Sequence, residues 1–136
     1  MGDQPLSIFQ ISGRAMSAQL TRMNTTASNL ANVGAVAGSA DTAYRAIKPV
    51  FRTHFDAASG LSTVDVEKVV TAGKEPTKRY DPGNPLADKD GNVFESGVDE
   101  TQELVDMLET TRSYQNNVEV MQTAKSLILD TLKLGR

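Results

Sequence analysis

Residues 98–134 form the longest stretch of the chain without Pro or Gly, and this stretch constrains the fold most. At ~1.5 Å per residue, a helix of this length would extend roughly 50 Å, longer than a compact domain of this size requires. Apolar and semi-apolar residues recur in it at intervals of three and four, which places one stripe on one helix face. Lys125 is the one charged member of the series, whose other members are Leu104, Met107, Thr111, Tyr114, Val118, Met121, Ile128 and Leu132. We therefore expect a long helix that needs packing partners along its length.

Residues 5–33 hold a second amphipathic pattern, with seam residues in strict four-three alternation: Phe9, Gly13, Met16, Leu20, Met23, Ala27 and Leu30. Such a heptad seam favours side-by-side packing with another long helix. The opposite face carries Ser, Thr, Gln and Asn in place of the Glu and Lys of a solvated helix. An ordinary surface helix is one interpretation of this segment. A helix face that is polar but uncharged more often contacts another subunit, and this is the interpretation we favour.

The middle of the chain, residues 34–97, indicates extended and irregular structure. Residues 34–43 are small and have the composition of a loop. Residues 44–55 and 61–70 alternate in the manner of strands, and we expect them to form a hairpin or small sheet, with Pro49 at an edge or an interruption. Residues 76–97 are expected to be irregular, with turns at 81–84 and 90–92.

The predicted fold class is therefore mainly α. Two long amphipathic helices, one at each end of the chain, pair as a coiled-coil-like layer, and a small irregular β-rich insert lies between them. The expected divisions are residues 1–33, 34–97 and 98–136.

Composition limits both the core and the function. The hydrophobic fraction of 39% and the aromatic fraction of 5% are low for a tightly packed globule, so we expect the core to be completed by association. A formal charge of -3 argues against nucleic acid as a partner. The sequence contains no apolar run of about 20 residues that would span a membrane, and its start lacks the layout of a cleavable secretory signal. The absence of Cys excludes disulfides and Cys-based metal sites.

No group of residues indicates catalysis. The segment Asp88-Lys89-Asp90-Gly91-Asn92 resembles a calcium loop, but Gly91 comes two residues too early, and we interpret the segment as a turn. His54 is the single His, which leaves no His-based zinc site or catalytic triad within one chain. We place the many carboxylates of residues 98–134 near the start of that helix, where capping and solvation explain them. We therefore expect no catalytic residues, no cofactor and no metal.

Three blocks of sequence resemble the bacterial flagellar rod and hook proteins. Residues 16–33, MSAQLTRMNTTASNLANV, are similar to the N-terminal signature of that family. The block at residues 113–136 is similar to the C-terminal signature, above all at Tyr114-Gln115, Asn117-Val118-Glu119-Val120 and Thr123-Ala124-Lys125. Residues 79–93, RYDPGNPLADKDGNV, and the short overall length resemble the proximal-rod members in particular.

This resemblance implies a structural subunit of the proximal rod, which assembles into the helical drive shaft and export channel of the flagellar basal body. It implies export from the cytoplasm by the flagellar type III apparatus, without a cleaved signal peptide, to a periplasmic rod. The implied partners are further copies and the rod proteins FlgB, FlgF and FlgG, together with the rod-base adaptor FliE. We assign subunit contacts to the two stripes: Phe9, Met16, Leu20, Met23, Ala27, Leu30, Leu104, Met107, Thr111, Tyr114, Val118, Met121, Ile128 and Leu132.

One departure from the family pattern concerns residues 34–43, GAVAGSADTA, which lengthen the loop before Tyr44. The geometry of this loop therefore cannot be taken from the family. A distal-rod or hook-type paralogue is one alternative, although these have a larger middle domain. A cytoplasmic helical export adaptor or chaperone is another, and it would need a core sufficient for a stable free dimer. A hydrolase that cuts the cell wall would require a carboxylate pair in a cleft, which the sequence does not supply.

Overall fold

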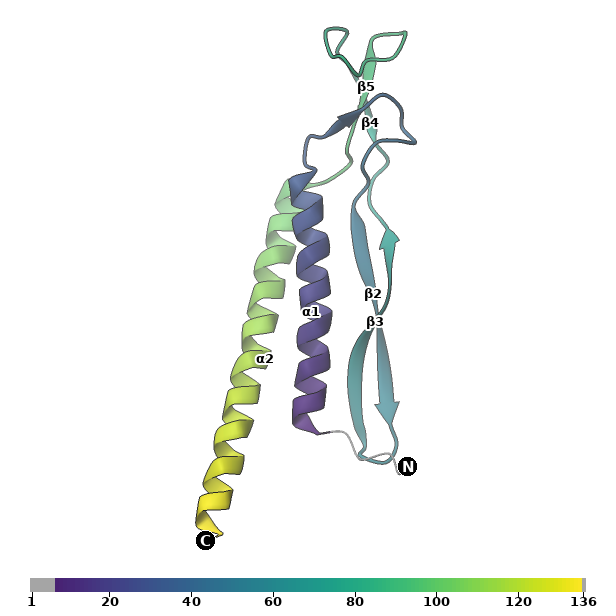
Figure 1. Cartoon of the computed structure of the whole chain (residues 1–136). Helices are drawn as coiled ribbons and strands as arrows, with labels where there is room; N and C mark the ends of the chain where they lie inside the picture. Colours follow the sequence, from purple (N-terminus) through teal and green to yellow (C-terminus); the bar gives the residue numbers. More distant parts are fainter. Residues whose placement is uncertain (1–6, 136) are drawn as a thin grey trace.

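Two long antiparallel helices lie beside a twisted β-hairpin, and a smaller sheet stands beyond one end of the helices (Figure 1). The computed structural model describes residues 7–135. Helix α1 spans Ile8–Ala31 and helix α2 spans Glu100–Leu134. Helix α1 packs against α2 on one side and against the hairpin on the other, so that it forms the middle of three layers.

Both helices begin at residues whose side chains satisfy the free backbone N–H groups of a first turn. In α1, Ser7 Oγ accepts from Gln10 N, and Gln10 Oε1 accepts from Ser7 N in return. In α2, Asp99 accepts from the backbone N of Gln102. The two predicted helices are therefore confirmed, except that residues 5 and 6 of the first one lie outside the described residues.

The hairpin is built from strands β2, Ile47–Asp56, and β3, Leu61–Thr71, which pair in antiparallel register. Its turn closes with a hydrogen bond of 2.9 Å from Gly60 N to Asp56 O, and the φ of +69° at Gly60 is one that favours glycine. Pro49 lies inside β2, and the register shifts just after it, between Val50 and Phe51. The predicted hairpin is thus confirmed, with its irregularity next to the proline.

A second sheet of three short strands occupies the regions that were expected to be loops. Strands β1 (Val36–Ala37), β4 (Thr77–Tyr80) and β5 (Asn92–Glu95) pair in the order β1-β5-β4. The turns predicted between β4 and β5 are present: Asn84 N donates to Asp81 O, and Gly91 N donates to Asp88 O. Asp88 Oδ1 also accepts from the backbone N of Asp90 and Asn92, which confirms a turn at this segment.

The prediction of a mainly α protein with a small irregular insert is wrong. Helices account for 46% of the structure and strands for 24%, arranged as two antiparallel sheets, so the chain is an α+β protein. The physical reason is that strands of two and four residues are too short to show a period-2 pattern. Their pairing partners lie far away in the sequence, and the Pro and Gly of the turns dominate the local composition.

The interior contains few large apolar side chains. The buried hydrophobic residues are Ala18, Ala43, Ala46, Val93 and Ala124. More polar or charged residues than apolar ones are buried: Ser12, Thr25, Thr26, Asn29, Thr63, Ser96, Glu103 and Thr110. Within residues 7–135, no helix is long and apolar enough to cross a membrane. Because the apolar core is small, hydrogen bonds must largely determine the relative positions of the helices and strands.

The joint between the three-stranded sheet and the helices is tight. Ser96 Oγ donates to Asn32 O at 2.7 Å, and Ser96 N donates to Ala35 O at 2.8 Å, which ties the end of β5 to the end of α1. At Gly97, a Cβ would lie 3.0 Å from Glu75 O and closer still to Lys74 O. Only glycine therefore allows the segment after β3 to pass this close to the start of α2.

Replacing Gly97 with Ala tests this joint. The added methyl group meets backbone oxygens that cannot rotate away, so we expect a loss of about 1–3 kcal/mol in the free energy of unfolding. Urea denaturation of the purified chain measures the loss. Gly83→Ala is the matched control, because a Cβ at Gly83 meets nothing within 4 Å. Equal stability of the Gly97→Ala variant and the unmodified chain would refute the close approach.

Candidate assembly surface

The side chain of Asn29 joins three elements of the fold. It is fully buried, with an exposed fraction of 0%. Its Nδ2 donates to Ile47 O and to Glu103 Oε2, each at 3.0 Å, while its Oδ1 accepts from Ile47 N at 2.9 Å and from Tyr44 Oη at 2.8 Å. One amide thus uses two donors and two acceptor positions, and these bonds join α1 to the start of β2 and to the first turns of α2.

Two neighbours complete this cluster. Tyr44 donates its single hydroxyl hydrogen to Asn29 Oδ1. Ser28 Oγ, 3.1 Å from Tyr44 Oη, is therefore the donor in the hydrogen bond between these two hydroxyl groups. Glu103 is only 4% exposed, although the sequence had suggested a solvated carboxylate near the helix start. A buried carboxylate requires a donor, and Asn29 supplies it. We call Ser28, Asn29, Tyr44, Ile47 and Glu103 the Asn29 cluster.

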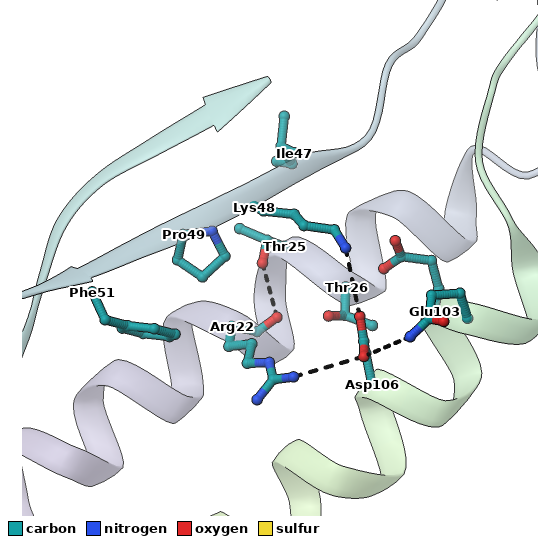
Figure 2. Close-up of a pocket in the computed structure, with 10 residues that line it drawn as sticks. Arg22, Thr25, Thr26, Ile47, Lys48, Pro49, Phe51, Glu103 and Asp106 are labelled. Atoms are coloured by element: carbon teal, nitrogen blue, oxygen red, sulfur yellow. Dashed lines mark hydrogen bonds and ion pairs between the residues drawn. The ribbon is translucent and has the colours of Figure 1, made fainter. Parts of the chain in front are cut away.

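A cleft of about 410 Å³ lies next to the Asn29 cluster, between α1, β2 and α2 (Figure 2). Asp106 lines it, 3.7 Å from a guanidinium nitrogen of Arg22 and 3.9 Å from Lys48 Nζ. Gln102 also donates to Asp106 Oδ1 at 3.1 Å. Arg22, Lys48 and Asp106 therefore pair with one another across the three elements. This arrangement supports a structural joint.

The polar face of α1 packs mainly within its own chain. The sequence interpretation assigned this face to another subunit, but Ser12, Thr25 and Asn29 are buried against the rest of the molecule. Ordinary amphipathic packing would have turned the apolar seam inward instead. The signal that sequence reasoning missed is the pairing of Asn29 with Glu103, two residues 74 positions apart in the chain.

The seam residues of α1 remain partly or wholly accessible. Phe9, Met16, Met23 and Leu30 are half-buried, whereas Ala27 is exposed and Leu20 has an exposed fraction of 45%. The seam residues of α2 divide along the helix: Met107, Thr111, Tyr114, Val118 and Met121 are half-buried, and Leu104, Ile128 and Leu132 are exposed. The predicted stripe of α2 is therefore partly covered only in its middle, whereas that of α1 is partly covered from Phe9 to Leu30, except at Leu20 and Ala27.

Helix α2 continues past the beginning of α1 (Figure 1). Ile8, at the start of α1, lines a shallow groove with Val120, Ala124 and Leu127, and every residue from 125 to 134 is exposed. We call residues 125–134 the free end of α2. Its exposed large apolar residues are Leu127, Ile128, Leu129, Leu132 and Leu134. Three of these, Leu127, Leu129 and Leu134, lie outside the predicted stripe, so the apolar surface is wider than the sequence analysis indicated.

The importance of the Asn29 cluster can be measured with Asn29→Ala. This change leaves Tyr44, the backbone of Ile47 and the Glu103 carboxylate without their partner, and we expect a loss of about 2–4 kcal/mol in the free energy of unfolding. Urea denaturation followed by circular dichroism is the measurement. Asn24→Ala, at an exposed position of the same helix, is the control and should change stability by less than about 0.5 kcal/mol. Similar losses in the free energy of unfolding for both variants would show that the Asn29 cluster contributes no more to stability than an exposed residue of the same helix.

Both ends of the chain match families of flagellar rod proteins. Residues 9–38 match a family described as "Flagella basal body rod protein", and residues 89–134 match "Flagellar basal body rod FlgEFG protein C-terminal". The chain is 45% identical over 133 residues to the flagellar basal-body rod protein FlgC of Salmonella typhimurium, which covers 96% of this chain and 98% of that protein.

Similar matches are found in other bacteria. Identity is 43% over 131 residues to FlgC of Escherichia coli O157:H7, with 96% of this chain and 98% of that protein covered. It is 38% over 132 residues to FlgC of a Buchnera aphidicola strain, with 96% and 97% covered. The similarity therefore includes the terminal helices and both sheets.

Proposed function

This chain belongs to the FlgC family of flagellar basal-body rod proteins, and we propose that it builds the proximal rod by packing its exposed helical surfaces against neighbouring subunits. It is a structural rod subunit of the bacterial flagellar basal body.

The observation that carries the proposal is the free end of α2. It exposes five large apolar side chains, with exposed fractions from 46% at Ile128 to 87% at Leu134. Fully burying one such side chain is worth about 1.5–3 kcal/mol, and contiguous exposed apolar surface on a folded protein marks a contact site. The chain's own α1 does not cover this surface, because α1 begins beside Ala124. A neighbouring subunit can cover it.

The shape of the helix pair suits a tube. Helices that expose apolar surface along their length can pack in parallel with those of successive subunits, and contacts between two different surfaces repeat along a helical assembly. Such a tube can transmit torque, because each subunit contacts neighbouring subunits on several sides. Its lumen provides a channel for exported proteins. The terminal helices form its inner layer in this proposal, and the two sheets lie outside it.

The position in the rod and the partners rest on the relatives. Named FlgC proteins match over nearly their whole length, without the additional middle domain expected of a distal-rod or hook protein, which favours the proximal rod. FlgB, FlgF, FlgG and FliE are the proposed neighbours, and the type III export apparatus is the proposed route. A cytoplasmic export adaptor is disfavoured by the free end of α2, because a stable free dimer would have no use for this much uncovered helix.

Charge placed on the free end of α2 provides the test. In a Leu127→Glu, Leu132→Glu double variant, two carboxylates would have to be buried without partners, which costs several kcal/mol at each copy of the contact. We expect the isolated chain to fold as before, because both positions are already exposed at 63%. Electron microscopy of basal bodies from cells that carry only this variant should show no completed rods.

The control is Ser126→Glu, which adds one carboxylate on the side of the helix that carries Glu119 and Asp130. That variant should build rods normally. Completed rods in the double variant, or equal failure in the control, would show that the free end of α2 is not the contact surface.

A further inference from the structure

We infer that Tyr80, at the end of β4, is an aromatic anchor that inserts into a groove on a second copy of this chain. The groove lies between the start of α1 and the later turns of α2, and we call it the Ile8 groove; its apolar lining is Ile8, Val120, Ala124 and Leu127. This contact rests on the proposed function, because it needs a neighbouring subunit. It gives a role to residues 79–93, which the helical contacts do not use.

Tyr80 is a large side chain that is exposed and yet held in place. Its exposed fraction is 71%, the highest of any aromatic residue in the described part of the chain. Its ring lies over Gly91, where a Cβ would be 3.0 Å from Tyr80 Cε2 and 3.1 Å from Pro82 Cβ. The φ of +77° at Gly91 also favours glycine. An exposed aromatic ring that is already restrained loses little freedom on binding, and such residues are typical anchors of protein contacts.

The loop beside Tyr80 is ordered by its own hydrogen bonds, although it protrudes from the fold (Figure 1). Asp81 N donates to Gly91 O at 2.9 Å, and Asp88 N donates to Asn92 O at 2.8 Å, which closes the base of the loop. Asp88 Oδ1 fixes the following turn through the backbone N of Asn92 at 2.8 Å. A binding loop that is fixed in advance loses less conformational entropy when a partner binds.

The Ile8 groove has the shape and chemistry to receive a tyrosine ring. Its volume is about 460 Å³, and two of its apolar walls, Ile8 and Leu127, are exposed at 47% and 63%. Ala124 is the buried member of the lining, so the deepest part of the groove is small and apolar. Asn116 and Thr123 line its polar side and are exposed, and they offer acceptors for a phenolic hydroxyl.

The charges beside the anchor and the Ile8 groove are opposite. Lys89 lies in the turn that precedes Gly91, and Glu119 lines the groove. Both are exposed, and neither forms an ion pair with another residue in the range 7–135. Complementary charges orient two docking surfaces, so Lys89 and Glu119 would fix the direction in which the loop enters the groove.

The two surfaces cannot meet within one chain. Strand β4 lies beyond the end of α1, whereas the Ile8 groove lies at its start (Figure 1). Helix α1 has 24 residues, which makes it roughly 36 Å long. A contact between different surfaces at opposite ends of a subunit is head-to-tail, and it can repeat along an open helical assembly. A sugar or lipid partner for Tyr80 would leave the matching groove and its carboxylate without a role.

Reversal of the two charges tests the orientation. Lys89→Glu and Glu119→Lys should each lower the number of completed basal bodies in cells about fivefold, because each places like charges together. The double variant restores opposite charges and should bring the number back to within about twofold of the unmodified chain. Lys68→Glu, at an exposed lysine of β3, is the matched control and should leave the number unchanged. Normal numbers in both single variants, or no restoration in the double variant, would overturn the inference.

Replacement of Tyr80 tests the anchor and identifies its partner. Tyr80→Ala should lower completed basal bodies roughly tenfold, as expected for a central aromatic anchor, without lowering the melting temperature of the purified chain. With p-benzoylphenylalanine at position 80, photo-cross-linked peptides from purified basal bodies should contain residues 116–127 of a second copy. Normal rods with Tyr80→Ala, or adducts only with other proteins, lipid or peptidoglycan, would overturn the inference and leave the proposed function intact. Absence of the unmodified chain from basal bodies would instead overturn the proposed function itself.

Discussion

The four hydrogen bonds of Asn29 fix the relative positions of α1, β2 and α2, and the rest of the structure depends on them. An amide that is fully satisfied in the interior gives strong geometric specificity, because any shift of one element leaves a buried polar group without a partner. The apolar core of this chain is too small to impose that geometry. The cluster therefore defines where the hairpin stands relative to the helix pair, and where the exposed surfaces of the helices point.

Holding the helices together with polar and small residues has a consequence for assembly. Asn29 of α1 bonds directly to Glu103 of α2, and the buried residues of the two helices include Thr25, Thr26 and Thr110, whereas a self-sufficient helical hairpin would bury leucines. The large apolar side chains are instead half-buried or exposed along the seam of α1 and exposed at the free end of α2, where another subunit can bury them. In the proposed assembly, these side chains would be buried in contacts between molecules.

The sequence allowed the two helices and the hairpin to be predicted, because their periodicities extend over many residues. It did not allow prediction of the three-stranded sheet, whose strands are held by distant partners, such as Thr77 and Val36, which both pair with Glu95. The inward face of α1 was not predicted, and the assignment of the apolar stripes to subunit contacts stays a prediction. Hydrophobic spacing predicts burial in the complete assembly, whereas the single chain buries the polar side through the pairing of Asn29 with Glu103, which no local pattern reveals.

We propose that the free chain is ordered around the Asn29 cluster and completes its apolar packing only in the rod. Hydrogen–deuterium exchange of the purified monomer and of isolated basal bodies can compare the two states. We expect amides of residues 103–117 to be protected in both samples, and those of residues 125–134 to exchange rapidly in the monomer and slowly in the rod. Strong protection of residues 125–134 in a proven monomer, or fast exchange there in the rod, would contradict the account.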